Sequence, residues 1–474
     1  MPHASVVRIY ATTQRPDYDS PWQSRVPSNS TGSGVVIGHN RVLTGAHVVA
    51  NATFLQVQRV SDPNKVLAQV IGICHDCDLA LIEIIDAPNF MEGITPAEVG
   101  ELPELRDRVS VVGFPIGGQE VSITEGVVSR IEVQRYSHSQ RHLLAVTVDA
   151  AINKGNSGGP VLKEGKIVGI AFQKLSNAEA IGEMVPAPII RHFLSAIEET
   201  PRLTIPLIGV ATQGLENSAL RSHLGLASEE TGVMVVSVPY GGSAHGVLEV
   251  GDAILAIEGY PIANNSTIRY LGRYRTRYDV MMGWKNIGDP LKLRILRDGQ
   301  RKEVTLSLQG PTPLVPSSQY DTVPTYFVYG GLVFQVLCRD FLATWDRWWN
   351  KAPKEFLYLY YSGERTEERT EVVILTQILA DAINVGYSHL YNEAIASVNG
   401  VPPRDMAHFV ALLEAQGDDE VVIQTSSRGL IVLNHATVQE ANARILARYR
   451  ITRDRSLDLM ASAPSDADAQ RVLS

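Results

Sequence analysis

The sequence predicts a mostly β protein, in which an antiparallel double β-barrel is followed by two smaller α+β domains. The barrels are indicated by residues 5–175, where short β-branched and apolar runs alternate with turns rich in Gly, Asn, Asp and Pro. The length also indicates several domains, because 474 residues with 45% hydrophobic content are too many to pack around a single core. At roughly 150 residues per domain, the length suggests about three domains.

The first domain is expected to consist of short strands until its last element. Residues 189–197 have helical spacing and should close the domain, and the Thr-Pro-Arg stretch at 200–202 marks its boundary. We therefore assign residues 1–200 to this domain. The clearest strands are expected at residues 5–10, 35–43, 109–114, 126–131 and 166–172.

A candidate nucleophile lies in the run Gly-Asn-Ser-Gly-Gly-Pro at residues 155–160. A serine hydroxyl becomes a good nucleophile only when a base takes its proton, and the oxyanion that forms needs preorganised donors. Glycines beside Ser157 permit the backbone shape that supplies such donors. Alone, this run could equally be a turn between strands, so a base and an acid elsewhere in the chain must decide.

Both partners are present upstream. His47 follows the apolar run 35–43, and Asp78 opens the apolar segment 78–84, where an acid is costly to bury without a partner. The chain order His, Asp, Ser is that of chymotrypsin-type double β-barrel serine proteases, whereas subtilisin-like and α/β-hydrolase triads run in other orders. An esterase or other acyl hydrolase is the disfavoured alternative.

These residues predict a division of catalytic labour. His47 would accept the proton of Ser157 and later give it to the leaving amine, while Asp78 would fix the imidazole tautomer. The N–H groups of Gly155 and Ser157, with Asn156 between them, would form the oxyanion hole.

The second domain, residues 201–312, predicts a peptide-binding module. Its Gly-Asp turn at 251–252 is followed by the pattern Ile-Leu-x-Ile-x-Gly, and an apolar run precedes a short helix and a strand. This order indicates a PDZ domain, which binds an extended chain end by strand addition and holds its carboxylate with loop N–H groups. The candidate carboxylate loop is formed by Pro206, Leu207, Ile208 and Gly209.

The third domain, residues 313–474, repeats the PDZ order in a looser form after the Pro- and Ser-bearing connector 311–318. Its insert at 341–361 is rich in Trp, Phe and Tyr, which favours core packing or an interface between protomers over a ligand cage. Residues 436–449 predict a helix, and the polar tail from residue 461 should be mobile.

Composition excludes several classes of function. A net charge of −9 without long charged blocks favours neither nucleic acid nor a membrane surface as partner, and no run approaches the ~20 apolar residues of a membrane span. Three cysteines make a disulfide framework unexpected. The pair Cys74 and Cys77 lacks the further ligands that a zinc site needs, so we expect no metal and no cofactor. Without a signal-peptide pattern, the compartment stays open: cytoplasm, nucleus or an organelle, or the periplasm if a leader was removed.

The motifs together resemble the HtrA/Deg family of serine proteases, and the resemblance covers nearly the whole chain. Segments 44–49, 78–81 and 155–160 match that family's triad segments. The plant Deg branch with a divergent second PDZ domain is most similar, through segments 112–118, 149–153 and 171–175. Gly45 departs from the Asn that the family usually carries beside its histidine.

This resemblance implies an ATP-independent endopeptidase that degrades misfolded or damaged proteins and forms trimers, hexamers or other multiples of trimers. The PDZ domains would capture unfolded substrates or C-terminal peptides, regulate the protease or build the assembly. Ile152, Phe172 and Lys174 would line a primary specificity pocket for a small or medium aliphatic residue. The alternative is a chaperone or scaffold with a resting, inactive protease domain, which would keep the same three catalytic residues.

Overall fold

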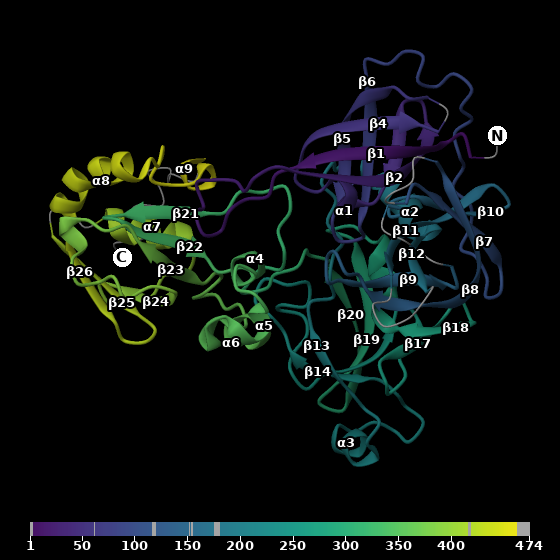
Figure 1. The fold of residues 1–474 in the computed structure, drawn as a ribbon. Helices are drawn as coiled ribbons and strands as arrows, with labels where there is room; N and C mark the ends of the chain where they lie inside the picture. The colour runs from purple at the N-terminus through teal and green to yellow at the C-terminus, as the bar shows by residue number, and fades with distance from the viewer. Residues whose placement is uncertain are drawn as a thin grey trace. The chain divides into compact units, whose positions relative to one another are not determined.

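A computed structural model of the chain describes residues 3–60, 62–115, 120–150, 152, 155–174, 181–415 and 419–461, without the side chains of 173, 174 and 461. The chain divides into two compact units (Figure 1). Unit 1 contains Met1–Gln14 and Pro27–Pro311, and unit 2 contains Arg15–Val26 and Thr312–Ser474.

Two closed antiparallel barrels form the first part of unit 1, which confirms the predicted double barrel. The first barrel has the strand order β1-β2-β3-β6-β5-β4, and the second has the order β10-β11-β12-β9-β8-β7. The strands of the first are β1 (Val6–Thr13), β2 (Ser28–Gly38), β3 (Arg41–Thr44), β4 (Ala52–Arg59), β5 (Lys65–Cys74) and β6 (Leu79–Ile85). Those of the second are β7 (Arg108–Gly113), β8 (Ser122–Arg135), β9 (His142–Val148), β10 (Pro160–Lys163), β11 (Lys166–Lys174) and β12 (Gly182–Pro186).

Two helices accompany the barrels. The single-turn helix α1 (Ala46–Val49) follows β3, and α2 (Ala187–Ala196) follows the last barrel strand, close to the predicted helix at 189–197. Helix α2 buries Ile190 and Phe193, because its apolar side chains recur at helical spacing.

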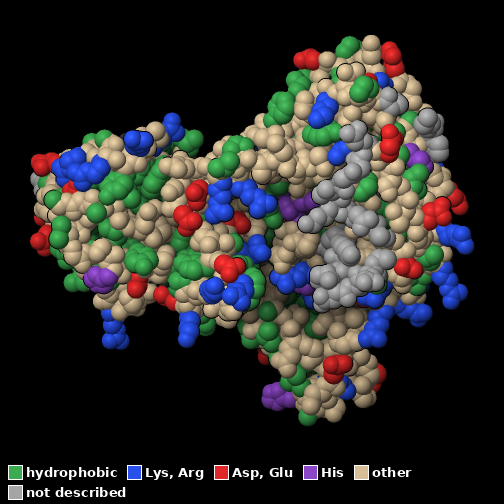
Figure 2. All heavy atoms as spheres, viewed as in Figure 1, with side chains coloured by type: hydrophobic (Ala, Val, Ile, Leu, Met, Phe, Trp, Pro, Cys, Tyr) green, Lys and Arg blue, Asp and Glu red, His purple; other side chains and the backbone are tan. Residues whose placement is uncertain are grey.

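A second sheet completes unit 1, with the order β13-β14-β15-β19-β20 and β16 paired to β15. A separate hairpin of β17 and β18 and the 3₁₀ helix η1 lie against the second barrel, where Val133 N donates to Thr276 Oγ1 at 2.7 Å. Figure 2 shows Lys and Arg side chains gathered over β8, β17 and β18. The elements are β13 (Ala211–Gly214), α3 (Ser218–His223), β14 (Val233–Ser237), β15 (Ala253–Ile257), β16 (Tyr260–Pro261), β17 (Thr267–Tyr270), β18 (Tyr274–Arg277), η1 (Tyr278–Trp284), β19 (Pro290–Arg297) and β20 (Gln300–Ser307).

Unit 2 is one antiparallel sheet in the order β21-β22-β23-β24-β25-β26 with helices around it. The predicted helix at 436–449 is present as α8, and the aromatic insert forms α4, α5 and α6. The strands are β21 (Tyr326–Tyr329), β22 (Leu332–Val336), β23 (Val373–Ile378), β24 (Glu393–Val398), β25 (Glu420–Thr425) and β26 (Leu430–Asn434). The helices are α4 (Arg339–Leu342), α5 (Trp348–Lys351), α6 (Lys354–Ser362), η2 (Ala382–Asn384), α7 (Met406–Glu414), α8 (His435–Tyr449) and α9 (Leu457–Ala461).

The segment between β1 and β2 belongs to unit 2, although it leaves from and returns to the first barrel. Tyr18 is buried in the same apolar cluster as Phe341 and Phe356 of the aromatic insert. Its backbone oxygen accepts a hydrogen bond from Gln335 Nε2 at 3.0 Å, and the Trp22 ring packs on Tyr326 with 6.0 Å between centroids. The core of unit 2 is therefore built from two distant parts of the chain.

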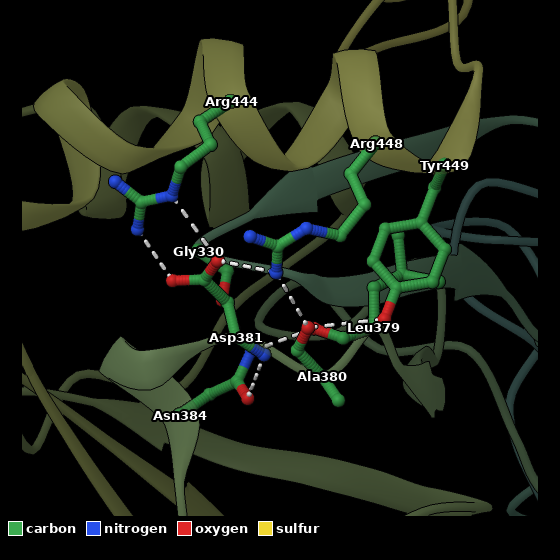
Figure 3. A network of polar contacts seen from close by, with 8 residues as sticks. All are labelled: Gly330, Leu379, Ala380, Asp381, Asn384, Arg444, Arg448 and Tyr449. Carbon is green, nitrogen blue, oxygen red and sulfur yellow. Dashed lines mark hydrogen bonds and ion pairs between the residues drawn. The ribbon is translucent and has the colours of Figure 1, made fainter.

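A polar network fixes helix α8 to the sheet of unit 2 (Figure 3). The buried carboxylate of Asp381 lies 2.5 Å from Arg444 Nη2 and 2.9 Å from Arg448 Nη1. Three residues further on, Asn384 Nδ2 donates to the carbonyls of Gly330 at 2.9 Å and Leu379 at 2.8 Å. The loop between β21 and β22 is thus held by side chains of its own unit.

Candidate active site

His47 and Asp78 are joined by two hydrogen bonds. His47 Nδ1 lies 2.7 Å from Asp78 Oδ2, and the backbone N–H of His47 donates to Asp78 Oδ1 at 2.8 Å. Helix α1 carries His47 directly after β3, and Asp78 sits in the turn before β6 with a φ of 56°, a left-handed conformation that Asp tolerates better than most residues. The two barrel strands β3 and β6 are paired, which brings both residues to one edge.

The electrostatics of this pair favour its charged forms. Burial alone would lower the pKa of His47, but the charge and hydrogen bond of Asp78 outweigh burial and raise it. Burial likewise opposes ionisation of Asp78, whose pKa is nevertheless lowered, first by the charge of His47 and then by its hydrogen bond. Asp78 therefore stays ionised while its side chain is only 1% exposed.

The loop that carries Ser157 is braced from the first barrel by Ser33. Ser33 Oγ donates to Gly155 O at 2.7 Å and accepts from Phe114 N at 2.8 Å, while Ser33 N donates to Ser157 O at 3.0 Å. Gly158 has a φ of 80°, and a Cβ there would collide with Thr44 Oγ1 and Ser33 O, so only glycine fits. Gly158 thus allows the backbone of this loop to lie directly against the first barrel.

Ser157 itself is partly buried, and its link to His47 is not made. Among the described residues, His47 Nε2 is buried and has no hydrogen-bond partner, so Ser157 Oγ does not donate to it. The side chain of Asn156 is fully buried, and its amide likewise lacks a partner in the described part of the chain. The His47–Asp78 half of the expected triad is therefore formed, and the hydrogen bond between Ser157 and His47 is not.

The expected specificity pocket is described only in part. Ile152 and Phe172 are both buried, and Ile152 lies so close to Gly182 that a Cβ at Gly182 would collide with it. The ring of Phe172 packs on Tyr136, with 4.4 Å between centroids. The side chain of Lys174 lies outside the described residues.

Comparison with known proteins agrees with this geometry. Residues 32–170 match the trypsin-like peptidase domain family, and residues 315–458 match a PDZ domain family. Protease Do-like 4, mitochondrial, of Arabidopsis thaliana is 37% identical over 448 residues, which cover 94% of this chain and 84% of the relative. The chain belongs to the Do-like, or HtrA/Deg, family of serine proteases.

Other members of the family support this placement. Protease Do-like 2, chloroplastic, of Arabidopsis thaliana is 35% identical over 468 residues, which cover 96% of this chain and 75% of the relative. A solved structure of the HtrA-type protease AlgW with a tripeptide is 26% identical and superposes with a TM-score of 0.50, covering 65% of this chain and 95% of AlgW. Within the described residues of this Deg-type protease, no helix is long and apolar enough to cross a membrane.

Two further histidines lie beside the His47–Asp78 pair of this protease, and no sequence pattern predicted an effect of either on that pair. His138, in the turn between β8 and β9, lies with its ring centroid 6.3 Å from that of His47. Its Nε2 is 2.9 Å from Nδ1 of His75, and its charge helps to lower the pKa of Asp78. A single histidine in a turn has no spacing signal that would have identified it.

The cysteines near this site are buried. Cys74 and Cys77 are both free thiols with no exposed surface, and they flank His75 in the turn before Asp78. Burial raises the pKa of the Cys77 thiol well above its usual value. No group of three or more His, Cys, Asp or Glu side chains is placed to hold a metal ion in the part of the chain that the structure describes.

The expected carboxylate loop of the protease is connected to the second barrel through Arg141. Arg141 Nη2 donates to the carbonyls of Ile205 at 2.8 Å and Pro206 at 3.0 Å. The loop continues through Leu207, whose N–H donates to Gln309 O at 3.0 Å, and Ile208, which is buried, to Gly209, whose φ is 75°. Arg141 of the second barrel therefore holds this loop in place through its backbone carbonyls.

Proposed function

We propose that this Deg-type protease is an ATP-independent endopeptidase that cleaves misfolded or damaged proteins with His47, Asp78 and Ser157. The observation that carries the proposal is the contact of His47 with the buried carboxylate of Asp78, 2.7 Å apart, at the edge of the first barrel, to which Ser33 fastens the serine loop. A histidine whose tautomer is fixed by a buried carboxylate is suited to act as general base toward a serine at the same edge.

In the proposed mechanism His47 Nδ1–H donates to Asp78, which leaves Nε2 free to take the proton of Ser157. Attack on the substrate carbonyl creates an oxyanion, which the N–H groups of Gly155 and Ser157 stabilise; losing one such donor typically costs ~3 kcal/mol of transition-state stabilisation. The imidazolium of His47 then protonates the leaving amine. Ile152, Phe172 and Lys174 are proposed to border the pocket for a small or medium aliphatic residue.

The downstream regions are proposed to divide two tasks. Residues 201–312 form a PDZ domain that captures chain ends with Pro206–Gly209, because β13 follows that loop and lies at the edge of its sheet, ready for strand addition. Residues 313–474 build the assembly into trimers or their multiples, because β22 is paired on both sides and the outer edge of β21 is bonded by residues 454–456. Among the described residues, both edges of β22 are therefore occupied.

A test of the assembly role targets the exposed aromatic side chains of α6. Tyr358 and Tyr361 are 66% and 62% exposed. If they lie between protomers, the double variant Tyr358→Ala, Tyr361→Ala will have a smaller mass by light scattering. The matched control is Tyr391→Ala, an exposed tyrosine elsewhere in unit 2. An unchanged mass in the double variant would remove these side chains from the interface.

A second candidate function is that of a chaperone or scaffold with a resting protease domain. The observation that favours it is the buried Nε2 of His47, which has no hydrogen-bond partner among the described residues. Catalytic hydrogen bonds often form only when substrate binds, so the same observation fits a protease at rest.

One experiment separates these functions. An unfolded model substrate is incubated with the wild type, with Ser157→Ala and with the exposed-serine control Ser228→Ala, across temperature and with added C-terminal peptides. We expect the wild type and the control to cut and Ser157→Ala to bind without cutting. Equal cleavage by Ser157→Ala excludes the triad assignment, and binding without cleavage by the wild type under every condition favours the chaperone.

A further inference from the structure

The β17–β18 hairpin carries two arginines that face each other. In the antiparallel register Arg269 is directly opposite Arg275. The neighbouring positions Ile268, Tyr270 and Tyr274 are buried, so the alternation of side chains places both arginines on the exposed face. Like charges directly opposite each other destabilise a strand pair, which makes this arrangement costly to the isolated protein.

These arginines line an open hollow of about 780 Å³, here called the arginine hollow. Its other charged lining residues are Arg221, Arg273 and a single acid, Glu216. The rest of the wall consists of hydroxyl and amide side chains together with Pro261, Ala263 and Ile268. The hollow is therefore strongly positive on a chain whose net charge is −9.

The positive charge of the arginine hollow is largely uncompensated. Arg273 pairs with Glu104 at 2.7 Å. Arg269 and Arg275, by contrast, form no ion pair with any carboxylate of the described residues, and Arg275 Nε reaches only Thr267 Oγ1 at 3.3 Å. Arg221 donates to the backbone carbonyls of Leu215 and Glu216, at 2.6 and 2.9 Å. Three guanidinium groups thus remain without a carboxylate partner there.

The hollow adjoins the end of the edge strand β13. Leu215, the residue after β13, donates its N–H to Asn264 O at 2.8 Å, and Asn264 lines the hollow. A peptide that adds antiparallel to β13 with its C-terminus at Pro206–Gly209 has its upstream residues at this end. The four residues of β13 span about 13 Å, at about 3.3 Å per residue, so the fifth and sixth ligand residues from the C-terminus reach the hollow.

We infer that the arginine hollow binds the carboxylates of acidic residues located upstream of a captured C-terminus, and so selects substrate tails of that composition. Guanidinium groups bind carboxylates with paired, charge-assisted hydrogen bonds. An open hollow suits a chain that continues past it. The inference rests on the proposed role of residues 201–312 as the peptide-capturing domain.

Binding is tested on the full chain with Ser157→Ala, so that peptides are held and not cut. Two labelled peptides share an apolar C-terminal tail and differ at the fifth and sixth positions from the end, which are Glu in one and Gln in the other. By fluorescence anisotropy we expect the Glu peptide to bind roughly tenfold more tightly, with a preference that falls as salt is added.

The matched variants add Arg269→Gln with Arg275→Gln, or Arg301→Gln, to the same background. Arg301 is an exposed arginine on β20 that pairs with Glu230 outside the hollow. We expect the preference for Glu to disappear in the double variant and to persist in the control. A preference that survives the double variant overturns the inference.

Thermal unfolding of the double variant shows whether a loss of peptide binding is caused by unfolding of the domain. The double variant removes both of the facing like charges, so its melting temperature should be unchanged or higher. If it falls, Arg269→Lys with Arg275→Lys keeps the charge, and should keep part of the preference.

Other outcomes distinguish a failure of the proposed arginine hollow from a failure of the peptide-capturing role proposed for residues 201–312. Equal binding of both peptides refutes the hollow alone, whereas failure of both peptides to bind refutes the peptide-capturing domain and the hollow together. Calorimetry with inorganic phosphate provides the last arm. Phosphate binding that depends on Arg269 and Arg275, without any advantage of Glu over Gln, would make this a phosphate site and overturn the peptide proposal.

Discussion

Arg141 and Asp76 form an ion pair, with 2.9 Å between Nη1 and Oδ2 and side chains that are 11% and 19% exposed. The contact lacks the alignment of a hydrogen bond at Nη1, so its attraction is mainly ionic. The same oxygen of Asp76 accepts a hydrogen bond from Ile205 N at 2.8 Å. Asp76 is two residues before Asp78, so the expected peptide-binding loop and the acid of the proposed triad are held by one short turn.

Replacing Arg141 should weaken both ends of this connection. We expect Arg141→Met to lower the free energy of unfolding by about 1–3 kcal/mol, because Asp76 loses its ion-pair partner and two carbonyls lose a charged donor. We also expect C-terminal peptides to lose their effect on kcat. Thermal unfolding and steady-state kinetics measure these, with exposed Arg130→Met as the control. Unchanged stability and an unchanged peptide response would show that the pair is dispensable.

The pH dependence of activity should reflect the raised pKa of His47. His47 must be neutral to accept the proton of Ser157, so kcat/KM should rise with pH with a midpoint above the ordinary histidine pKa of 6.5. Asp78→Asn removes the charge that raises the pKa, so the midpoint should move down, and kcat should fall by roughly 10⁴-fold. A wild-type midpoint below 6.5 would contradict the electrostatics described above.

The same pair makes stability depend on pH with a defined sign. A raised folded pKa of His47 contributes stability below the unfolded pKa, and this is lost as pH rises through the folded value. The lowered pKa of Asp78 contributes stability above the unfolded value of 3.8, which is lost as pH falls through the folded one. The melting temperatures of Asp78→Asn and the wild type should therefore differ most between pH 3.8 and pH 6.5, the unfolded pKa values of Asp and His. A difference in melting temperature that does not change with pH would count against the coupling of the two groups.

Ser33 should matter for catalysis although it is not a member of the proposed triad. Ser33→Ala leaves Gly155 O and Phe114 N without their buried partner, which should cost about 1–3 kcal/mol of stability. We expect kcat to fall more than KM changes, because the loop that carries Ser157 loses its brace. The control is Ser30→Ala, an exposed serine on the same strand β2. Equal kinetics of both variants would mean that the loop holds its shape without Ser33.

Asp381 should be important for the packing of α8 in unit 2. The pKa of its carboxyl is lowered, first by the hydrogen bond from Arg444, so it contributes stability at neutral pH that is lost as pH falls through the folded pKa. We expect Asp381→Asn to cost about 1–3 kcal/mol and to reduce hydrogen-exchange protection of α8. Exposed Asp346→Asn is the control. Unaltered protection of α8 would assign its packing to apolar contacts alone.

The barrels and the main helices were predictable because their signals are local. Alternating apolar strands, the helical spacing at 189–197 and the helix at 436–449 depend on neighbouring residues only. The proximity of His47 and Asp78 was also predictable, since chain order together with a known chemical geometry replaces the missing contact information.

Other features depend on contacts between distant segments and leave no local pattern. Ser33 is one of many serines in a turn-rich strand, and its role follows from a loop more than a hundred residues away. His138 acts on Asp78 only because two barrels meet. The polar segment 15–26 has no periodicity, and its apolar partners begin beyond residue 311. The facing arginines of the β17–β18 hairpin required a strand register that the sequence did not specify.

The location of segment 15–26 in unit 2 changes what a cut in the connector at 311–318 would do. After such a cut the C-terminal fragment would no longer share a peptide chain with the rest, yet Tyr18 and Trp22 would still be packed in its core. The N-terminal and C-terminal fragments of the cut protein would therefore stay associated through the core of unit 2. We expect denaturant to separate them, whereas dilution alone should not.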